Sequence, residues 1–197
     1  MPVIKYKKIM EKMFKKPVFL IEDLHNENIP KNYSKKLLHI LAKTGKIKQI
    51  ERGKYTCLDD PVAIASHITQ PCYLSLWTAL SIRGLTDQIP FTVEVFTSRK
   101  RFKKTINFLG TKIIFHSVSP KMMFGYENIV WKDNIRIAIA KREKIIIDAI
   151  YIGGVPREDI IQLIRASDAS LLKKYSKLTG NKKLIKKVNK MIKEAIN

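Results

Sequence analysis

The chain has 197 residues, and 45% of them are hydrophobic. It is therefore long enough for one large domain or two small ones, and it is too apolar for a disordered protein. Its apolar runs are too short to span a membrane, its first residues are too charged for a secretory signal, and its two cysteines lack metal-ligand spacing. We therefore expect no membrane association, no disulfide framework and a cytoplasmic protein.

The charge of the chain is concentrated at its two ends. Lys and Arg total 38 against 17 acidic residues, for a net charge of +21. Residues 1–58 carry 14 basic and 5 acidic residues, residues 59–168 carry 15 and 11, and residues 169–197 carry 9 and 1. Basic ends favour a polyanionic partner such as nucleic acid. The alternative is a lysine-rich, solvated surface, with a lysine content raised by A/T-rich codons.

The first quarter of the chain predicts three helices followed by a hairpin. Apolar spacing predicts helices over residues 4–14, 21–25 and 32–44, the last with Asn32 as its N-cap. Two alternating runs then meet at Gly53, which has the backbone freedom that a tight turn needs. The core of this unit is predicted to consist of Ile21, Leu24, Leu37, Leu41, Ile47 and Tyr55.

This order of elements predicts a winged helix-turn-helix. In that unit the third helix enters the major groove, while the hairpin lies along the sugar-phosphate backbone. Helix residues are expected to contact base edges, and hairpin residues are expected to contact phosphates. A small packed hairpin with charged edges is the alternative. The predicted DNA-binding residues are Asn32, Ser34, Lys35, Lys36, His39, Lys43, Lys46, Lys48, Arg52 and Lys54.

The remainder of the chain predicts a larger α+β domain with a basic helical C-terminus. We expect the two domains to span residues 1–58 and 59–197. The tail over 182–193 has an apolar stripe that needs burial, most simply within the chain, although dimerisation and DNA binding are alternatives. Helices are expected over 61–68, 73–85, 141–151, 156–167 and on both sides of Gly180, and strands over 92–98, 111–119, 125–131 and 134–140.

A second basic cluster follows the first of these strands. It either extends a DNA footprint along the duplex or forms a plain solvated loop. It consists of Arg99, Lys100, Arg101, Lys103 and Lys104.

The sequence carries no motif for a catalytic site. It has no phosphate-binding glycine loop, and its four histidines are scattered, so we expect no enzyme, cofactor or metal. The alternative is a metal-dependent nuclease built on Glu94 and Asp87, but the acidic-x-lysine step that such sites place on a following strand is missing. Asp148 lies among apolar residues, and we expect it to be hydrogen-bonded to backbone or to a nearby arginine, the alternative being a buried acid that matters to a site.

Several segments together resemble the AbiEi family of antitoxins from type IV toxin–antitoxin systems. They are "SLWTALSIRGL", "VEVFTS" and "IRIAIAKREKIIIDAIYIGGVP", and "GKIKQIERGKY" is similar to the family's wing. The resemblance covers residues 15–160 and leaves out the lysine-rich tail. The matching residues are Ala79-Leu80 with Gly84-Leu85, Thr97, and Glu143-Lys144 with Asp148.

The resemblance implies an autorepressor that binds inverted repeats in its own promoter. It also implies a protein that counteracts a nucleotidyltransferase-like toxin without forming a stable complex with it. The Glu-Lys-x-x-x-Asp helix is not expected to be catalytic. A purely protein-binding antitoxin remains an alternative, and both a monomer and a dimer are compatible with the sequence.

Overall fold

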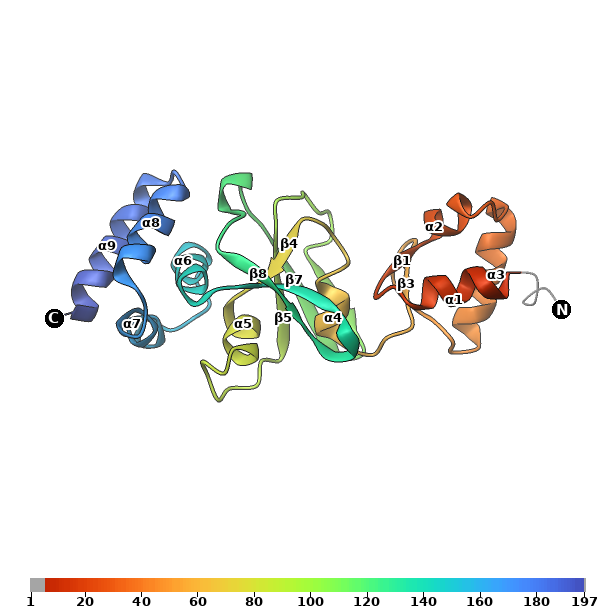
Figure 1. Cartoon of the computed structure of the whole chain (residues 1–197), viewed down its shortest axis with the longest axis horizontal. Coiled ribbons are helices and arrows are strands. Elements are labelled where there is room, and N and C mark those ends of the chain that lie inside the picture. The colour runs from red at the N-terminus through yellow and green to blue at the C-terminus, as the bar shows by residue number, and fades with distance from the viewer. Residues whose placement is uncertain (1–5, 197) are drawn as a thin grey trace.

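The computed structural model describes residues 6–196 and has an α+β fold. The molecule is elongated, with the first helices at one end, a mixed sheet in the middle and the last helices at the other end (Figure 1). Within the described residues, no helix combines the length and apolar character needed to cross a bilayer.

The N-terminal unit contains three helices and a small antiparallel sheet. The strands lie in the order β1-β3-β2, and Gly53 at the hairpin turn has a φ of +78°. The sequence pattern does not predict strand β1, because its two residues form a strand only by pairing with β3. The elements are α1 (Lys7–Phe14), β1 (Phe19–Leu20), α2 (Ile21–Asn26), α3 (Lys31–Lys43), β2 (Lys48–Glu51) and β3 (Lys54–Thr56).

This unit has its own hydrophobic cluster, which joins α1, α2, α3 and the start of the hairpin. Leu24, Leu37, Leu41 and Ile47 are buried as predicted, and Ile21 and Tyr55 pack against them half-buried. One detail of the prediction is wrong: helix α3 begins at Lys31 with Pro30 as its N-cap, so Asn32 lies in the first turn and does not cap the helix. Residues 4 and 5 of the predicted first helix lie outside the described residues.

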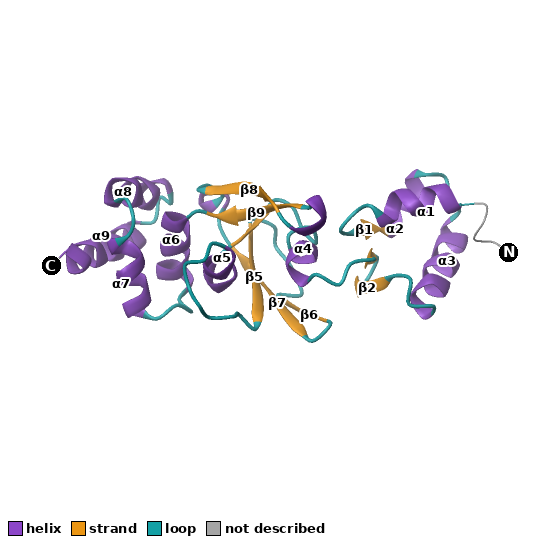
Figure 2. Cartoon of the chain, turned by 60° about the horizontal axis from the view of Figure 1, so that its bottom comes forward, coloured by secondary structure: helices purple, strands orange, loops and turns teal. Residues whose placement is uncertain are grey.

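The central unit is built on a six-stranded mixed sheet in the order β6-β7-β5-β4-β9-β8. The β5–β7 and β4–β9 pairs are parallel and the others are antiparallel. Figure 2 shows β8 and β9 strongly rotated relative to β5 and β7. The strands are β4 (Cys72–Leu74), β5 (Thr92–Thr97), β6 (Thr105–Phe108), β7 (Thr111–Ser117), β8 (Tyr126–Val130) and β9 (Arg136–Ala140).

Helices cover both faces of this sheet. Helix α4 packs on the face toward the N-terminal unit, whereas α5 and α6 pack on the opposite face (Figure 1). Beyond them, α7, α8 and α9 form the far end of the molecule. The helices are α4 (Pro61–Ala65), α5 (Leu76–Ile82), α6 (Arg142–Ile152), α7 (Arg157–Arg165), α8 (Ala169–Leu178) and α9 (Lys182–Ile196), with 3₁₀ turns over Pro120–Met122 and Lys132–Asn134.

The predicted helix over 73–85 is wrong in its first part. The chain forms strand β4 over Cys72–Leu74, turns at Ser75, and begins α5 at Leu76, whose φ is +52°. The fully buried apolar residues of a central strand give no alternation, so they look like one side of a buried helix. Strand β6 is also absent from the prediction, because it follows directly on the basic cluster.

Helix α9 packs within the chain, as expected. Leu184, Val188, Ile192 and Ala195 are buried against α6, α7 and α8. Ile196, which the helical spacing places beside this stripe, is 74% exposed. The lysines of α9 therefore lie on the outer side of a helix whose apolar side is already covered.

Candidate nucleic-acid interface

Helix α3 presents a continuous polar and basic face to solvent. Lys35, Lys36 and His39 are exposed, together with Lys31 and Asn32 in the first turn. At 100° per residue these positions, with Lys43, span an arc of about 140° on the helix surface. Within residues 6–196, no ion pair or side-chain hydrogen bond engages any of these six side chains.

The opposite side of α3 determines this orientation. Leu37, Leu38 and Leu41 are at most 3% exposed and pack into the N-terminal core. Because leucines at these spacings must face the core, the lysines between them must face water. The sequence prediction omits Lys31, although its position four residues before Lys35 places it on the same face.

Ser34 is a correction to the predicted set. Its side chain is fully buried, and its hydroxyl donates to the carbonyl oxygens of Pro30 at 3.2 Å and Ile29 at 3.4 Å. Ser34 therefore stabilises the first turn of α3 and does not belong to the exposed face.

The hairpin residues divide into two groups. Lys46 and Arg52 are exposed, and their side chains form no ion pair or hydrogen bond with the described part of the chain. Lys48 instead forms an ion pair with Asp59. Lys54 pairs with Glu51 at 2.9 Å and donates to the carbonyl oxygen of residue 68, so it faces the central unit. The predicted contact of Lys54 with DNA phosphates would require these contacts to be exchanged, and it stays a prediction.

Arg101, from the second basic cluster, is also turned inward. It donates to Glu51 at 2.7 Å, and its guanidinium carbon lies 4.1 Å from the centroid of the Phe115 ring. Arg99 donates to the carbonyl oxygen of Gln70 at the surface. Arg99 nevertheless stays exposed, as do Lys100, Lys103 and Lys104, so only Arg101 of this cluster is withdrawn from the surface.

Glu51, Lys54 and Arg101 together form a link between the hairpin and the central sheet, which we call the hairpin link. Burial alone would raise the pKa of Glu51, but the hydrogen bonds and charges of Lys54 and Arg101 outweigh it, and the net pKa is lowered. Next to this link, Ile50 of β2 joins the hydrophobic cluster of the central unit. The hairpin is thus held between the two units.

A second group of polar residues is buried in the middle of the molecule. Asp148 of α6 has no exposed surface and accepts hydrogen bonds from Lys144, from Ser75 at 2.8 Å and from Tyr73 at 3.3 Å. Its partners are therefore side chains of α6, of β4 and of the β4–α5 junction. The prediction that Asp148 is hydrogen-bonded to backbone or to an arginine is wrong. The Lys144 ammonium also lies 4.9 Å from the Phe124 ring centroid.

Burial acts on both charges of this pair. Loss of water raises the pKa of Asp148 and lowers the pKa of Lys144, and their mutual attraction opposes both shifts. Burial, reinforced by the neighbouring carboxylate, also raises the pKa of Tyr73. With no exposed surface on Lys144, Asp148 or Ser75, this cluster has the character of a structural element.

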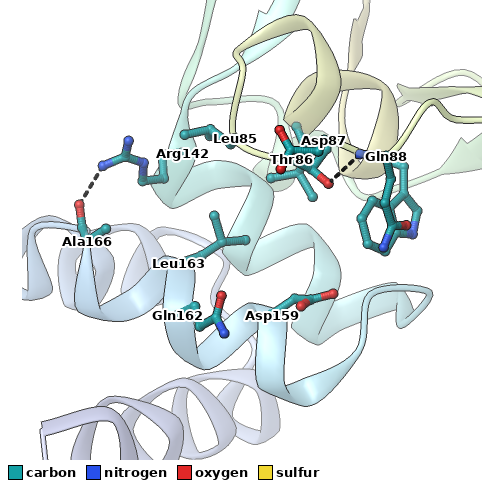
Figure 3. Close-up of a pocket in the computed structure, with 11 residues that line it drawn as sticks. Leu85, Thr86, Asp87, Gln88, Arg142, Asp159, Gln162, Leu163 and Ala166 are labelled. Atoms are coloured by element: carbon teal, nitrogen blue, oxygen red, sulfur yellow. Dashed lines mark hydrogen bonds between the residues drawn. The ribbon is translucent and has the colours of Figure 1, made fainter.

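The acids of the nuclease alternative do not come together. Asp87 lines a cavity of about 500 Å³ between the α5–β5 loop, α6 and α7 (Figure 3). Asp159 and Gln162 of α7 line the same cavity. Glu94 does not line this cavity, and its carboxylate lies 3.4 Å from His116 on β7. Across residues 6–196, no three His, Cys, Asp or Glu side chains converge in a way that could hold a metal ion.

No protein-family model matches the chain, and no curated protein matches it significantly. The resemblance to the AbiEi family therefore rests on the quoted residues alone.

Proposed function

We propose that the N-terminal unit is a winged helix-turn-helix and that the protein is a DNA-binding transcriptional regulator. The order α1-β1-α2-α3-β2-β3 supports this interpretation, because it places a solvent-facing helix directly before a two-stranded hairpin. Helix α3 would then lie in the major groove, and the hairpin turn would lie beside the adjacent backbone.

The observation that carries the proposal is the unpaired face of α3. Four lysines with no acidic partner among the described residues repel one another, and a phosphate backbone would relieve that repulsion and release counterions. The same face carries Asn32 and His39, whose side chains both donate and accept hydrogen bonds and can therefore distinguish base edges. Lysines that contact phosphates position a protein on DNA, whereas side chains that contact base edges, such as Asn and His, give it sequence preference.

The hairpin contributes fewer contacts in this proposal than the sequence predicts. Lys46 and Arg52 are available for phosphates, whereas Lys48 and Lys54 are committed to carboxylates of the protein itself. Base recognition would therefore depend chiefly on α3.

The regulatory role rests on the resemblance to the AbiEi family. We infer an autorepressing antitoxin in the cytoplasm that binds inverted repeats in its own promoter and acts against a nucleotidyltransferase-like toxin. A purely protein-binding antitoxin is the competing function, and it differs in requiring no contact between α3 and DNA.

The test compares binding to the upstream DNA of the gene with binding to an unrelated duplex of equal length. We expect the Lys35→Glu/Lys36→Glu variant to lose the preference for the upstream DNA, because it reverses two charges on the face that meets the bases. Fluorescence anisotropy of both duplexes at two salt concentrations gives the ratio of affinities.

The matched control is Lys103→Glu/Lys104→Glu, which reverses an adjacent pair of exposed lysines before β6, outside α3 and the last two helices. It changes the net charge equally, so it should leave the ratio between the two duplexes unchanged even if both affinities fall. An α3 variant with the same ratio as the parent protein would exclude the proposed role of α3. The absence of any shift by the parent protein, together with capture of a toxin, would favour the protein-binding alternative.

A further inference from the structure

A second lysine-rich surface lies at the end of the molecule opposite α3 (Figure 1). It is formed by exposed residues of α8 and α9, and we call it the C-terminal lysine surface. In the described part of the chain, only Lys190 among its members has an acidic neighbour, Glu194 at 4.0 Å. Its members are Lys173, Lys174, Lys177, Lys182, Lys183, Lys186, Lys187, Lys190 and Lys193.

The exposed residues of α9 repeat the spacing of those on α3. On α3 the first five exposed polar positions are 31, 32, 35, 36 and 39, and on α9 they are 182, 183, 186, 187 and 190. Both sets occupy an arc of about 140° on the outer side of a helix. Two helices at opposite ends of one chain thus expose polar side chains with the same spacing.

The chemistry of the two faces differs in one respect. The α3 face includes Asn32 and His39, whereas all five equivalent positions of α9 are lysines. The ammonium group is a point charge with three donors and no acceptor, and it suits phosphate oxygens without selecting a base. The α9 face is therefore suited to a nucleic-acid backbone of any sequence.

Two other polyanionic partners fit less well. A helix that binds an anionic membrane inserts its apolar side into the bilayer, but Leu184, Val188 and Ile192 of α9 are buried inside the protein. Protein interfaces are depleted in lysine at their centre and need apolar anchors, which the outward side of α9 lacks. Nucleic-acid interfaces, by contrast, are strongly basic and polar.

We propose that the C-terminal lysine surface is a second, sequence-independent binding site for duplex nucleic acid, separate from α3. Because the two faces lie at opposite ends of an elongated chain, one molecule would hold two duplex segments together. Binding of the first duplex rests on the function proposed above for α3. Binding of the second duplex is argued only from the residues of α8 and α9.

The experiment immobilises the upstream duplex on beads, saturates it with the full-length protein, and adds a labelled duplex of unrelated sequence. We expect the parent protein to retain the labelled duplex and the Lys186→Glu/Lys187→Glu variant to retain at least about tenfold less. Lys186→Arg/Lys187→Arg keeps both charges and should retain the labelled duplex. Circular dichroism checks that the variants keep the helical content of the parent.

A direct binding measurement separates this inference from the function proposed for α3. In the Lys35→Glu/Lys36→Glu background, residual binding to an unrelated duplex should persist and should disappear when Lys186→Glu/Lys187→Glu is added. In an otherwise unaltered chain, the α9 pair should lower the slope of log affinity against log salt for that duplex by about 1.8, because each neutralised phosphate contributes about 0.9 to that slope.

Three results would overturn the inference. The first is equal retention of the labelled duplex by the α9 variant, and the second is no retention by a parent protein that is itself shown to be bound to the beads. The third is binding to phosphatidylserine vesicles, abolished by the α9 substitutions, when duplex binding is unaffected by them.

Discussion

The lysines of α3 and Lys144 of α6 show two opposite uses of the same side chain. On α3, four lysines lie in water with no acidic partner within the described residues. In α6, Lys144 has no exposed surface and is held by Asp148, whose carboxylate also accepts a hydrogen bond from Ser75. An exposed, unpaired cation is available to a partner molecule, whereas a buried, paired cation is needed by the fold.

This difference predicts the largest effect for a change in the buried cluster. Asp148→Ala should lower the free energy of unfolding by about 3–5 kcal/mol, because it leaves the Lys144 charge buried without its counterion. The double variant Lys144→Met/Asp148→Ala should recover part of that loss, since it removes the stranded charge. Urea denaturation measures both values. A loss well below 1 kcal/mol for Asp148→Ala would show that the pair does not hold the sheet and α6 together.

On the exposed face, a change should alter recognition and leave stability nearly constant. Asn32→Ala should cost about 1–3 kcal/mol of discrimination at one base pair of the upstream DNA. Lys31→Ala should instead weaken binding to all sequences alike, since a lysine on phosphate carries no sequence information. Binding to a set of single-base variants of the duplex distinguishes the two patterns. Identical profiles for both variants would contradict the division of roles on α3.

Elements with one apolar side are the ones that the sequence predicts well. Periodicity identifies the three N-terminal helices and α9, because each has one apolar side against a single core. It does not identify β1, which exists only through its pairing with β3, or β4, whose residues are buried on both faces.

The candidate site shows the same division between local and long-range information. The sequence places Lys35, Lys36 and His39 correctly on the exposed side, since local spacing determines the face of a helix. It does not show that Arg101 turns inward, because its partner Glu51 lies 50 positions away in the chain. Nor does it show that Lys54 donates to the carbonyl oxygen of residue 68, which lies 14 positions away. Charge counts along a sequence do not distinguish cations that meet a partner molecule from cations that hold two parts of the protein together.

The hairpin link should have an intermediate effect that depends on pH. Glu51→Gln should lower the free energy of unfolding by about 1–2 kcal/mol at neutral pH, since it weakens the contacts to Lys54 and Arg101. Because the folded protein lowers the pKa of Glu51, this contribution is present above the ordinary value of 4.5 and is lost as the pH falls through the lowered value. Denaturation at pH 7 and at pH 4 or below tests the sign: a gap between parent and variant that widens on acidification would contradict the assignment.

The smallest effect is expected at the C-terminal lysine surface. Lys173→Ala should change the free energy of unfolding by no more than about 0.5 kcal/mol, because the side chain is exposed and has no acidic neighbour among the described residues. Thermal unfolding of this variant alongside Asp148→Ala would place both extremes on one scale. A large destabilisation by Lys173→Ala would mean that this surface serves the fold.

Site-specific photocrosslinking to the upstream duplex tests the central claim most directly. A photoreactive amino acid replaces His39 on α3 in one protein and Glu158, an exposed residue of α7, in another. We predict a covalent adduct with DNA bases from position 39 and none from position 158. Failure of position 39 to crosslink to a duplex that the protein demonstrably binds would contradict the placement of α3 in the major groove.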